Sequence, residues 1–190
     1  VLAAALPSAS SVSLLAERLT DAHFRELEDS RELNIGLPVQ GIGSFRLSAF
    51  LQRGSISAVI RFIPHDVPKL DALHLPEVLK DLIMERRGMI LVVGAAGSGK
   101  STTIASMLDH RNELSTGHVL TFEDPIEYLF RNKKSIINQR EIGSDARTLQ
   151  AALRSAMRQA PDVIFIGEIR DRDTMSAAIA YSMSGHLVVA

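Results

Sequence analysis

The chain has 190 residues, 46% of them hydrophobic, which predicts one full globular domain or one and a half small ones. Its 21 basic and 22 acidic residues give a net charge of -1, which argues against a nucleic-acid partner. There is no cysteine for disulfides or thiolate metal sites, and no run approaches the roughly 20 apolar residues of a membrane span.

Both ends indicate a piece of a longer protein. The first ten residues, VLAAALPSAS, have no initiator methionine and no basic region of a signal peptide. The last five, HLVVA, read as a buried strand that the sequence breaks off. We therefore expect the C-terminal domain to be incomplete, and any membrane association to go through a partner.

The first third of the chain predicts a small α+β unit. Apolar residues recur among charges in residues 12–29, a spacing typical of one or two surface helices packed on a sheet. The short β-prone runs that follow lie at 33–35, 44–52 and 55–63, with a hairpin-like turn at Arg53 and Gly54. Prolines then cluster between residues 64 and 76, so we expect a linker there.

In the rest of the chain predicted strands and helices alternate. The expected elements are a helix at 76–87, an apolar strand from 89, helices at 102–110, 147–158 and 174–183, strands at 117–122, 162–166 and 187–189, and short β-segments at 126–130 and 135–138. This alternation predicts a largely parallel sheet covered by helices on both faces, which is an α/β fold.

A glycine-rich loop follows the first of these strands. Residues 94–101 read GAAGSGKS and match G-x-x-x-x-G-K-[ST] at every fixed position. In such a loop backbone N–H groups wrap a phosphate, Lys100 reaches the β/γ-phosphates and Ser101 holds Mg²⁺. The N-terminus of the next helix adds a positive end. The predicted nucleotide-binding residues are Gly94, Ala95, Ala96, Gly97, Ser98, Gly99, Lys100, Ser101 and Thr102; the alternative is a glycine-rich turn without a ligand.

Glu168 ends a second apolar strand, 163–166, after a single glycine. In nucleotide-binding folds of this kind a strand beside the loop strand delivers an acid to the attacking water and to Mg²⁺. We therefore predict Glu168 to be the general base or the water-orienting residue. Gly167 stands where the metal-binding acid is usual, and the alternative for Glu168 is an exposed carboxylate paired with Arg170.

Three more acids, Glu123, Asp124 and Glu127, follow the strand at 117–122. Pro125 prevents a simple continuation of the strand, so the acids lie on a bend at a strand end, where α/β sheets bind ligands. Together with Ser101 they are the candidate Mg²⁺ ligands. A solvated turn is the alternative.

Five segments in this order carry a family resemblance: ILVVGAAGSGKSTT, TFEDPIEY, KKSIINQREIGSD, ALRSAMRQAPDVIFIGEIRD and SGHLVVA. They resemble the Walker A loop, the Asp box, a connecting stretch, a Walker B motif whose aspartate is glycine, and the His box of the secretion and type IV pilus motor ATPases. The wording is most similar to the retraction branch of PilT and PilU, with the PilU side closer. An earlier stretch, NIGLPVQGIGSFRLSAFLQRGSISAVIRFIP, resembles the PAS-like N-terminal domain of that branch.

The resemblance implies a partial PAS-like α+β domain at 1–64, a linker at 65–75 and an incomplete RecA-like P-loop ATPase domain at 76–190. It also implies that Glu168 is the catalytic glutamate and that Glu127 lies near Mg²⁺. His186 is matched to the first His-box histidine, and Arg46 and Arg61 to arginine fingers. The alternatives are that His186 is only hydrogen-bonded structure and that the two arginines pair with acids on the sheet.

The implied function is an ATP-hydrolysing motor subunit, assembled as a homohexamer, that drives type IV pilus retraction in twitching motility. Its expected cofactors are ATP and Mg²⁺, and its expected place is the cytoplasmic face of the inner membrane, against the pilus platform protein. Two alternatives stay open. One is another motor of the superfamily, for pilus extension or type II secretion; the other is an accessory, nucleotide-responsive subunit beside a paralogous retraction ATPase.

Overall fold

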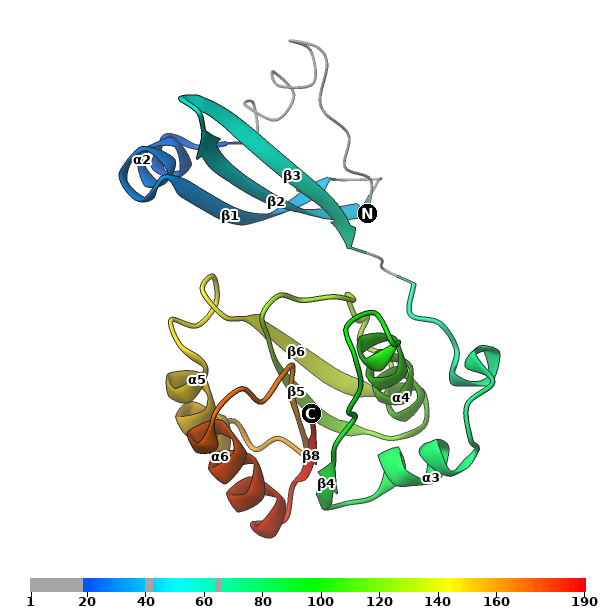
Figure 1. The fold of residues 1–190 in the computed structure, drawn as a ribbon. Helices are drawn as coiled ribbons and strands as arrows, with labels where there is room; N and C mark the ends of the chain where they lie inside the picture. The colour runs from blue at the N-terminus through cyan, green and yellow to red at the C-terminus, as the bar shows by residue number, and fades with distance from the viewer. Residues whose placement is uncertain (1–18, 40–42, 64–65) are drawn as a thin grey trace. The chain divides into compact units, whose positions relative to one another are not determined.

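The computed structural model describes residues 19–39, 43–63 and 66–190, and the chain divides into two compact units, Val1–Pro64 and His65–Ala190 (Figure 1). The part of the predicted helical region at 12–18 lies outside the described residues. Each unit is described separately below.

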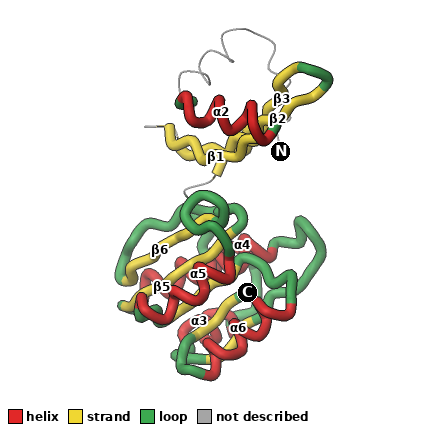
Figure 2. The backbone as a smooth tube through the Cα atoms, turned by 90° about the vertical axis from the view of Figure 1, so that its left-hand side faces the viewer, coloured by secondary structure: helices red, strands yellow, loops and turns green. Residues whose placement is uncertain are grey.

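The first unit is one helix on a three-stranded antiparallel sheet. Helix α2 spans Asp21–Ser30, and the strands β1 (Glu32–Val39), β2 (Gly43–Gln52) and β3 (Ser55–Ile63) pair in the order β1-β2-β3. The helix begins where the Thr20 hydroxyl accepts a hydrogen bond from the His23 N–H, and it lies along β1 (Figure 2). Its Leu27 packs on Leu33 and Ala49, which gives this unit a small apolar core on one face of the sheet.

The second unit is a five-stranded parallel sheet between helices. Its strands are β4 (Gly88–Ile90), β5 (Gly117–Glu123), β6 (Ser135–Glu141), β7 (Val163–Ile166) and β8 (Leu187–Val189), in the order β4-β8-β7-β5-β6. Its helices are α3 (Val78–Met84), α4 (Lys100–Leu114), α5 (Leu149–Ala156) and α6 (Arg172–Met183), with short 3₁₀ turns η1 (Leu70–Leu73) and η2 (Met157–Gln159). All four strand pairs are parallel, which confirms the predicted α/β fold.

Alternate residues of the central strands belong to two separate hydrophobic cores. Val163 and Phe165 of β7 pack with residues of α3 and α4, whereas Ile164 and Ile166 pack with residues of α5 and α6. Figure 1 shows these two pairs of helices on opposite sides of the sheet. Because both faces of the strand are buried, its sequence is apolar throughout rather than alternating.

Two expectations for this unit need correction. Residues 126–130 form no strand, because side chains of β6 rather than a neighbouring backbone bind the N–H groups of Ile126 and Phe130. The helix expected at 76–87 is shorter, since Glu85 leaves the helical conformation with ψ 148°. Leu70, inside the expected linker at 65–75, is buried in the core beside α3 and α4.

The strand before the glycine-rich loop is also less buried than expected. β4 has three residues and, within the described part of the chain, lies at the edge of the sheet beside β8. Val93, just after it, is 91% exposed.

The described residues form no helix long and apolar enough to cross a membrane.

Candidate nucleotide site

The carboxyl ends of the parallel strands meet at one edge of the sheet, and the predicted site residues follow three of these ends. The glycine-rich loop comes after β4, the acidic bend after β5, and Glu168 after β7. β5 and β7 are direct neighbours, with Phe122 opposite Ile166, and the Gly167 N–H donates to the Phe122 carbonyl at 2.7 Å. The strand order therefore brings the two acidic segments together.

A cleft of about 210 Å³ at this edge collects most of the predicted residues. It is lined by Lys100, Ser101, Ala105, Glu123, Asp124, Pro125, Glu127, Tyr128, Phe130, Phe165, Gly167 and Glu168. The loop lysine, the loop hydroxyl and all four predicted acids thus border a single space. Phosphates and a divalent cation are the ligands that this combination of charges suits.

The loop adopts a conformation that depends on glycine. Gly97 and Gly99 have φ angles of 75° and 93°, which favour glycine strongly, and a Cβ at Gly94 would come within 2.6 Å of Ser98 Oγ. The Lys100 ammonium lies against this loop and donates to the carbonyls of Gly94 at 3.0 Å and Ala95 at 2.9 Å. The helix α4 starts at Lys100 itself, so the lysine and Ser101 stand in its first turn.

Glu123 is the most buried of the acids, with 5% of its surface exposed. Its Oε1 accepts hydrogen bonds from Thr121 Oγ1 at 2.7 Å and Gln139 Nε2 at 3.1 Å. Burial raises the pKa of this carboxyl, and the hydrogen bonds from Thr121 and Gln139 oppose that rise. One of its two oxygens is therefore already committed to the protein.

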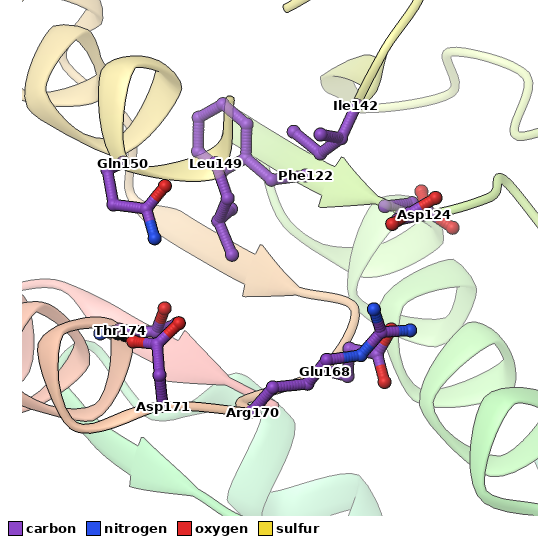
Figure 3. Close-up of a pocket in the computed structure, with 10 residues that line it drawn as sticks. Phe122, Asp124, Ile142, Leu149, Gln150, Glu168, Arg170, Asp171 and Thr174 are labelled. Atoms are coloured by element: carbon purple, nitrogen blue, oxygen red, sulfur yellow. Dashed lines mark hydrogen bonds and ion pairs between the residues drawn. The ribbon is translucent and has the colours of Figure 1, made fainter. Parts of the chain in front are cut away.

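Glu168 makes contacts of both kinds that the sequence analysis considered, with the cleft and with Arg170. It lines the cleft, and its carboxylate also forms an ion pair with Arg170. A second cleft of about 170 Å³, between the end of β7 and the helices α5 and α6, contains both side chains, and Figure 3 shows them next to each other there. Both groups are largely exposed, so the pair is weak and can exchange partners.

The neighbouring strand β5 explains why residue 167, the usual metal-binding position of this strand, is a glycine and not an acid. A Cβ there would lie 3.2 Å from Glu123 Cα and 3.2 Å from the Phe122 carbonyl oxygen. These are backbone atoms of the neighbouring strand and cannot move aside cheaply. The close approach of β5 thus favours glycine, and the acids of the cleft come from the end of β5 and from Glu168.

Three residues that line or support the cleft carried no distinguishing signal in the sequence. Gln139 and Glu141, both on β6, bind backbone N–H groups of the segment 124–130. The Tyr128 hydroxyl lies 3.1 Å from Thr102 Oγ1 in the first turn of α4. The β-segment predicted at 135–138 ends before both residues, whereas β6 continues to Glu141 and places Gln139 and Glu141 on one face.

Three predicted residues remain: Arg46, Arg61 and His186. Arg46 and Arg61 belong to the first unit, where they are direct cross-strand neighbours on β2 and β3. His186 precedes β8 and therefore lies at the amino-terminal ends of the parallel strands, whereas the glycine-rich loop follows a carboxyl end. Its Nδ1 lies 3.2 Å from the Tyr181 carbonyl. Its assignment to the His box stays a prediction.

The donor set suits Mg²⁺ carried by phosphates. All the candidate ligands, Ser101, Glu123, Asp124 and Glu127, offer oxygen, which Mg²⁺ prefers. Among the described residues no three acids or histidines stand close enough to hold a metal by themselves. Mg²⁺ commonly binds through one or two protein oxygens together with substrate phosphates, and the cleft fits that pattern.

Comparison with known proteins gives consistent relatives. A family model described as "Type II/IV secretion system protein" matches residues 12–190. The chain is 46% identical over 172 residues to the type IV pilus ATPase PilU of Pseudomonas aeruginosa, covering 90% of this chain and 45% of that protein. It is 41% identical over 176 residues to the pilus retraction ATPase PilT of the same organism, covering 93% and 51%.

The fold has a close counterpart among solved structures. The crystal structure of the pilus retraction motor PilT with bound ADP matches with a TM-score of 0.90 at 44% identity, covering 95% of this chain and 52% of that one. The chain spans about half the length of the curated relatives that it matches.

Proposed function

Because the chain belongs to the type II/IV secretion system protein family, we propose that it is part of an ATP-hydrolysing motor subunit that drives type IV pilus retraction. The observation that carries the proposal is the cleft in which Lys100 and Ser101 of the glycine-rich loop face acids from the ends of β5 and β7. The relatives PilU and PilT, named as pilus ATPases, support the same reading.

In the proposed reaction water attacks the γ-phosphate of ATP in line with the leaving oxygen. The loop residues 94–102 bind the phosphates, and Lys100 neutralises charge on the β- and γ-phosphates as it develops. Glu168, released from Arg170, orients the attacking water and accepts its proton. Ser101, with Asp124 and Glu127, holds the Mg²⁺, which supplies further charge neutralisation; Glu123 supports them from its buried position.

We further propose that turnover depends on a homohexamer. Arg46 and Arg61 would reach the nucleotide of a neighbouring subunit, as arginine fingers do in other phosphoryl-transfer enzymes, where they contribute roughly 10³–10⁵ in rate. The motor would work at the cytoplasmic face of the inner membrane, against the pilus platform protein. His186 keeps its proposed place in the His box, although its contacts in this unit are structural.

The test is Mg²⁺-dependent ATP turnover by the full-length protein over a concentration series, with the oligomer size followed in parallel. Lys100→Ala is expected to abolish nucleotide binding. Glu168→Gln is expected to retain binding and to lower kcat by at least about 100-fold, the usual range for a lost general base. Lys134→Ala, which removes an exposed lysine on the loop before β6, is the matched control and should turn over as the wild type does.

One observation favours a second candidate, an accessory subunit that responds to nucleotide without needing its own turnover. The carboxylate proposed as the base forms an ion pair with Arg170. A wild-type hexamer that binds ATP but hydrolyses it no faster than Glu168→Gln would refute the motor proposal and support this one. Turnover that rises with assembly and is lost in both variants would refute the accessory role.

A further inference from the structure

The segment that joins β5 to β6 carries two of the acids in the cleft, Asp124 and Glu127, but forms neither helix nor strand. Side chains of β6 hold it instead. Glu141 Oε2 accepts from the Ile126 N–H at 3.0 Å, and Gln139 Oε1 accepts from the Phe130 N–H at 2.9 Å. The position of these two acids is therefore set from a neighbouring strand.

Gln139 uses both ends of its amide for this purpose. While its Oε1 accepts from Phe130, its Nε2 donates to the Tyr128 carbonyl at 2.8 Å and to Glu123 Oε1 at 3.1 Å. These three bonds connect the end of β5 with the middle and the end of segment 124–130. A carboxylate could make only the first of them and a thioether none, so the arrangement depends on an amide.

The connection continues to the glycine-rich loop. The Tyr128 hydroxyl lies 3.1 Å from Thr102 Oγ1, and Thr102 is in the first turn of α4, directly after Lys100 and Ser101. One amide on β6 thus reaches both sides of the cleft, through Glu123 and through Tyr128. It touches no part of the space where the phosphates would lie, because it is absent from the cleft lining.

We propose that Gln139 is a positioning residue for the divalent cation and the reacting phosphate: its amide holds Glu123 and the segment with Asp124 and Glu127 in the geometry that the bound nucleotide requires. The proposal rests on the proposed ATP hydrolysis. Residues behind metal ligands that fix their orientation typically contribute 10- to 100-fold to metal affinity or activity. Gln139 has this relation to the acids of the cleft.

A purely structural role makes a different prediction. If Gln139 only stabilised the loop, its loss would lower the melting temperature and leave cation affinity in the folded protein unchanged. If it positions the acids, its loss weakens the cation that those acids help to hold. Nucleotide binding without a cation, which relies on the loop backbone and Lys100, stays the same.

The test uses full-length Gln139→Met, which preserves the length of the side chain and removes all three hydrogen bonds. The matched control is Asn138→Leu, one residue earlier on β6, where the lost bond joins Asn138 Oδ1 to His118 Nε2 at 2.9 Å. Mn²⁺ affinity in the presence of ADP is measured by the loss of the free Mn²⁺ spin-resonance signal. ADP binding in EDTA and steady-state turnover are measured on the same samples.

For Gln139→Met we expect about a 10-fold weaker Mn²⁺ affinity, a fall in kcat of at least about 10-fold, and ADP binding in EDTA within twofold of wild type. Asn138→Leu should match wild type in all three. If the wild type hydrolyses ATP and Gln139→Met binds Mn²⁺ as tightly as the wild type does, the proposal is overturned.

A second variant keeps the test decisive if Gln139→Met does not fold. Gln139→Glu keeps the acceptor for the Phe130 N–H, loses the two donated bonds and places a second carboxylate beside Glu123. Because added negative charge alone would strengthen cation binding, weaker Mn²⁺ affinity with reduced turnover supports the proposal. Mn²⁺ affinity at least as tight as in the wild type, with wild-type turnover, overturns it. Absence of turnover in the wild type, with Mn²⁺ affinity still weakened in Gln139→Met, would refute the proposed hydrolysis and leave the positioning role standing.

Discussion

At the scale of single residues, Gly167 shows how a missing side chain can be a structural requirement. In nucleotide-binding folds of this kind an acid is usual at this strand end, and this chain has glycine there. The reason lies in the adjacent strand, whose Phe122 carbonyl accepts from the Gly167 N–H at 2.7 Å. β5 and β7 approach so closely beyond their paired residues that a Cβ would fit only if the backbone of β5 shifted. The acids that line the cleft come from positions where the backbones diverge.

Replacing this glycine should therefore destabilise the second unit. In Gly167→Ala the new Cβ would lie 3.2 Å from two backbone atoms of β5, and overpacking of this kind costs about 1–3 kcal/mol. Gly167→Asp should cost at least as much and should not increase turnover. The measurement is the free energy of unfolding in urea. Gly36→Ala is the control, because a Cβ at Gly36 meets no atom within 4 Å; equal stability of the two alanine variants would contradict the argument.

At the scale of elements, α4 links the nucleotide loop to the rest of the second unit. Its first turn carries Lys100 and Ser101, and its apolar residues Ile104, Met107 and Leu108 are buried against the sheet. Near its other end the buried Arg111 donates to the carbonyls of Ile83 at 2.6 Å and Glu85 at 2.8 Å, where α3 ends. The guanidinium thus satisfies backbone oxygens that a helix C-terminus leaves without partners. Burial lowers the pKa of Arg111, although it stays charged.

Removing that guanidinium should uncouple the two helices. Arg111→Met keeps much of the apolar stem and leaves the α3 carbonyls without their charged donor, which should cost about 1.5–3 kcal/mol of unfolding free energy. The exposed Arg158, on η2, provides the control, and Arg158→Met should change stability by less than about 0.5 kcal/mol. Urea denaturation of both variants gives the comparison. A loss below about 0.5 kcal/mol in Arg111→Met would show that these hydrogen bonds contribute little.

At the scale of the whole molecule, the nucleotide cleft and the proposed arginine fingers belong to different units. The second unit holds the loop and the acids, and the first holds Arg46 and Arg61, which are cross-strand partners on a sheet face opposite to the one that packs on α2. Like charges placed directly opposite destabilise a sheet, although each of these arginines also has an interaction partner of its own. Contact with an anionic ligand of a neighbouring subunit is the role proposed for them.

Mixing two inactive variants tests this directly. Arg61→Ala should lower turnover at least about tenfold while leaving nucleotide binding unchanged, and Glu168→Gln should be inactive for a different reason. If the arginine acts on a neighbouring subunit, a hexamer formed from equal amounts of both has about a quarter of its interfaces intact and regains a corresponding share of activity. Arg25→Ala, an exposed arginine on α2, should keep wild-type turnover. Mixtures no more active than the separate variants would show that the arginine acts within its own chain or not at all.

The family and the fold class were both predictable from the sequence. The resemblance to the pilus retraction branch is confirmed by the relatives PilU and PilT and by the PilT structure. The parallel sheet followed from strands that are apolar throughout and alternate with helices, since burial on both faces leaves that pattern. The division at 64, 65–75 and 76–190, the PAS-like nature of the first unit and the roles of the site residues stay predictions.

By itself the sequence determined what is local: the glycine-rich loop, the order of helices and strands, and the acids that follow two strand ends. Only the tertiary structure decided which of these meet. Strand order puts β5 beside β7 and β6, and this brings Gly167 against Glu123 and Gln139 under the segment 124–130. It also puts His186 at the amino-terminal ends of the strands, away from the cleft at their carboxyl ends. The expected strand at 126–130 is replaced by a segment that side-chain hydrogen bonds hold. The physical reason is that hydrophobic periodicity indicates which face of a helix or strand is buried. Which other helix or strand packs on that face depends on contacts between residues far apart in the chain.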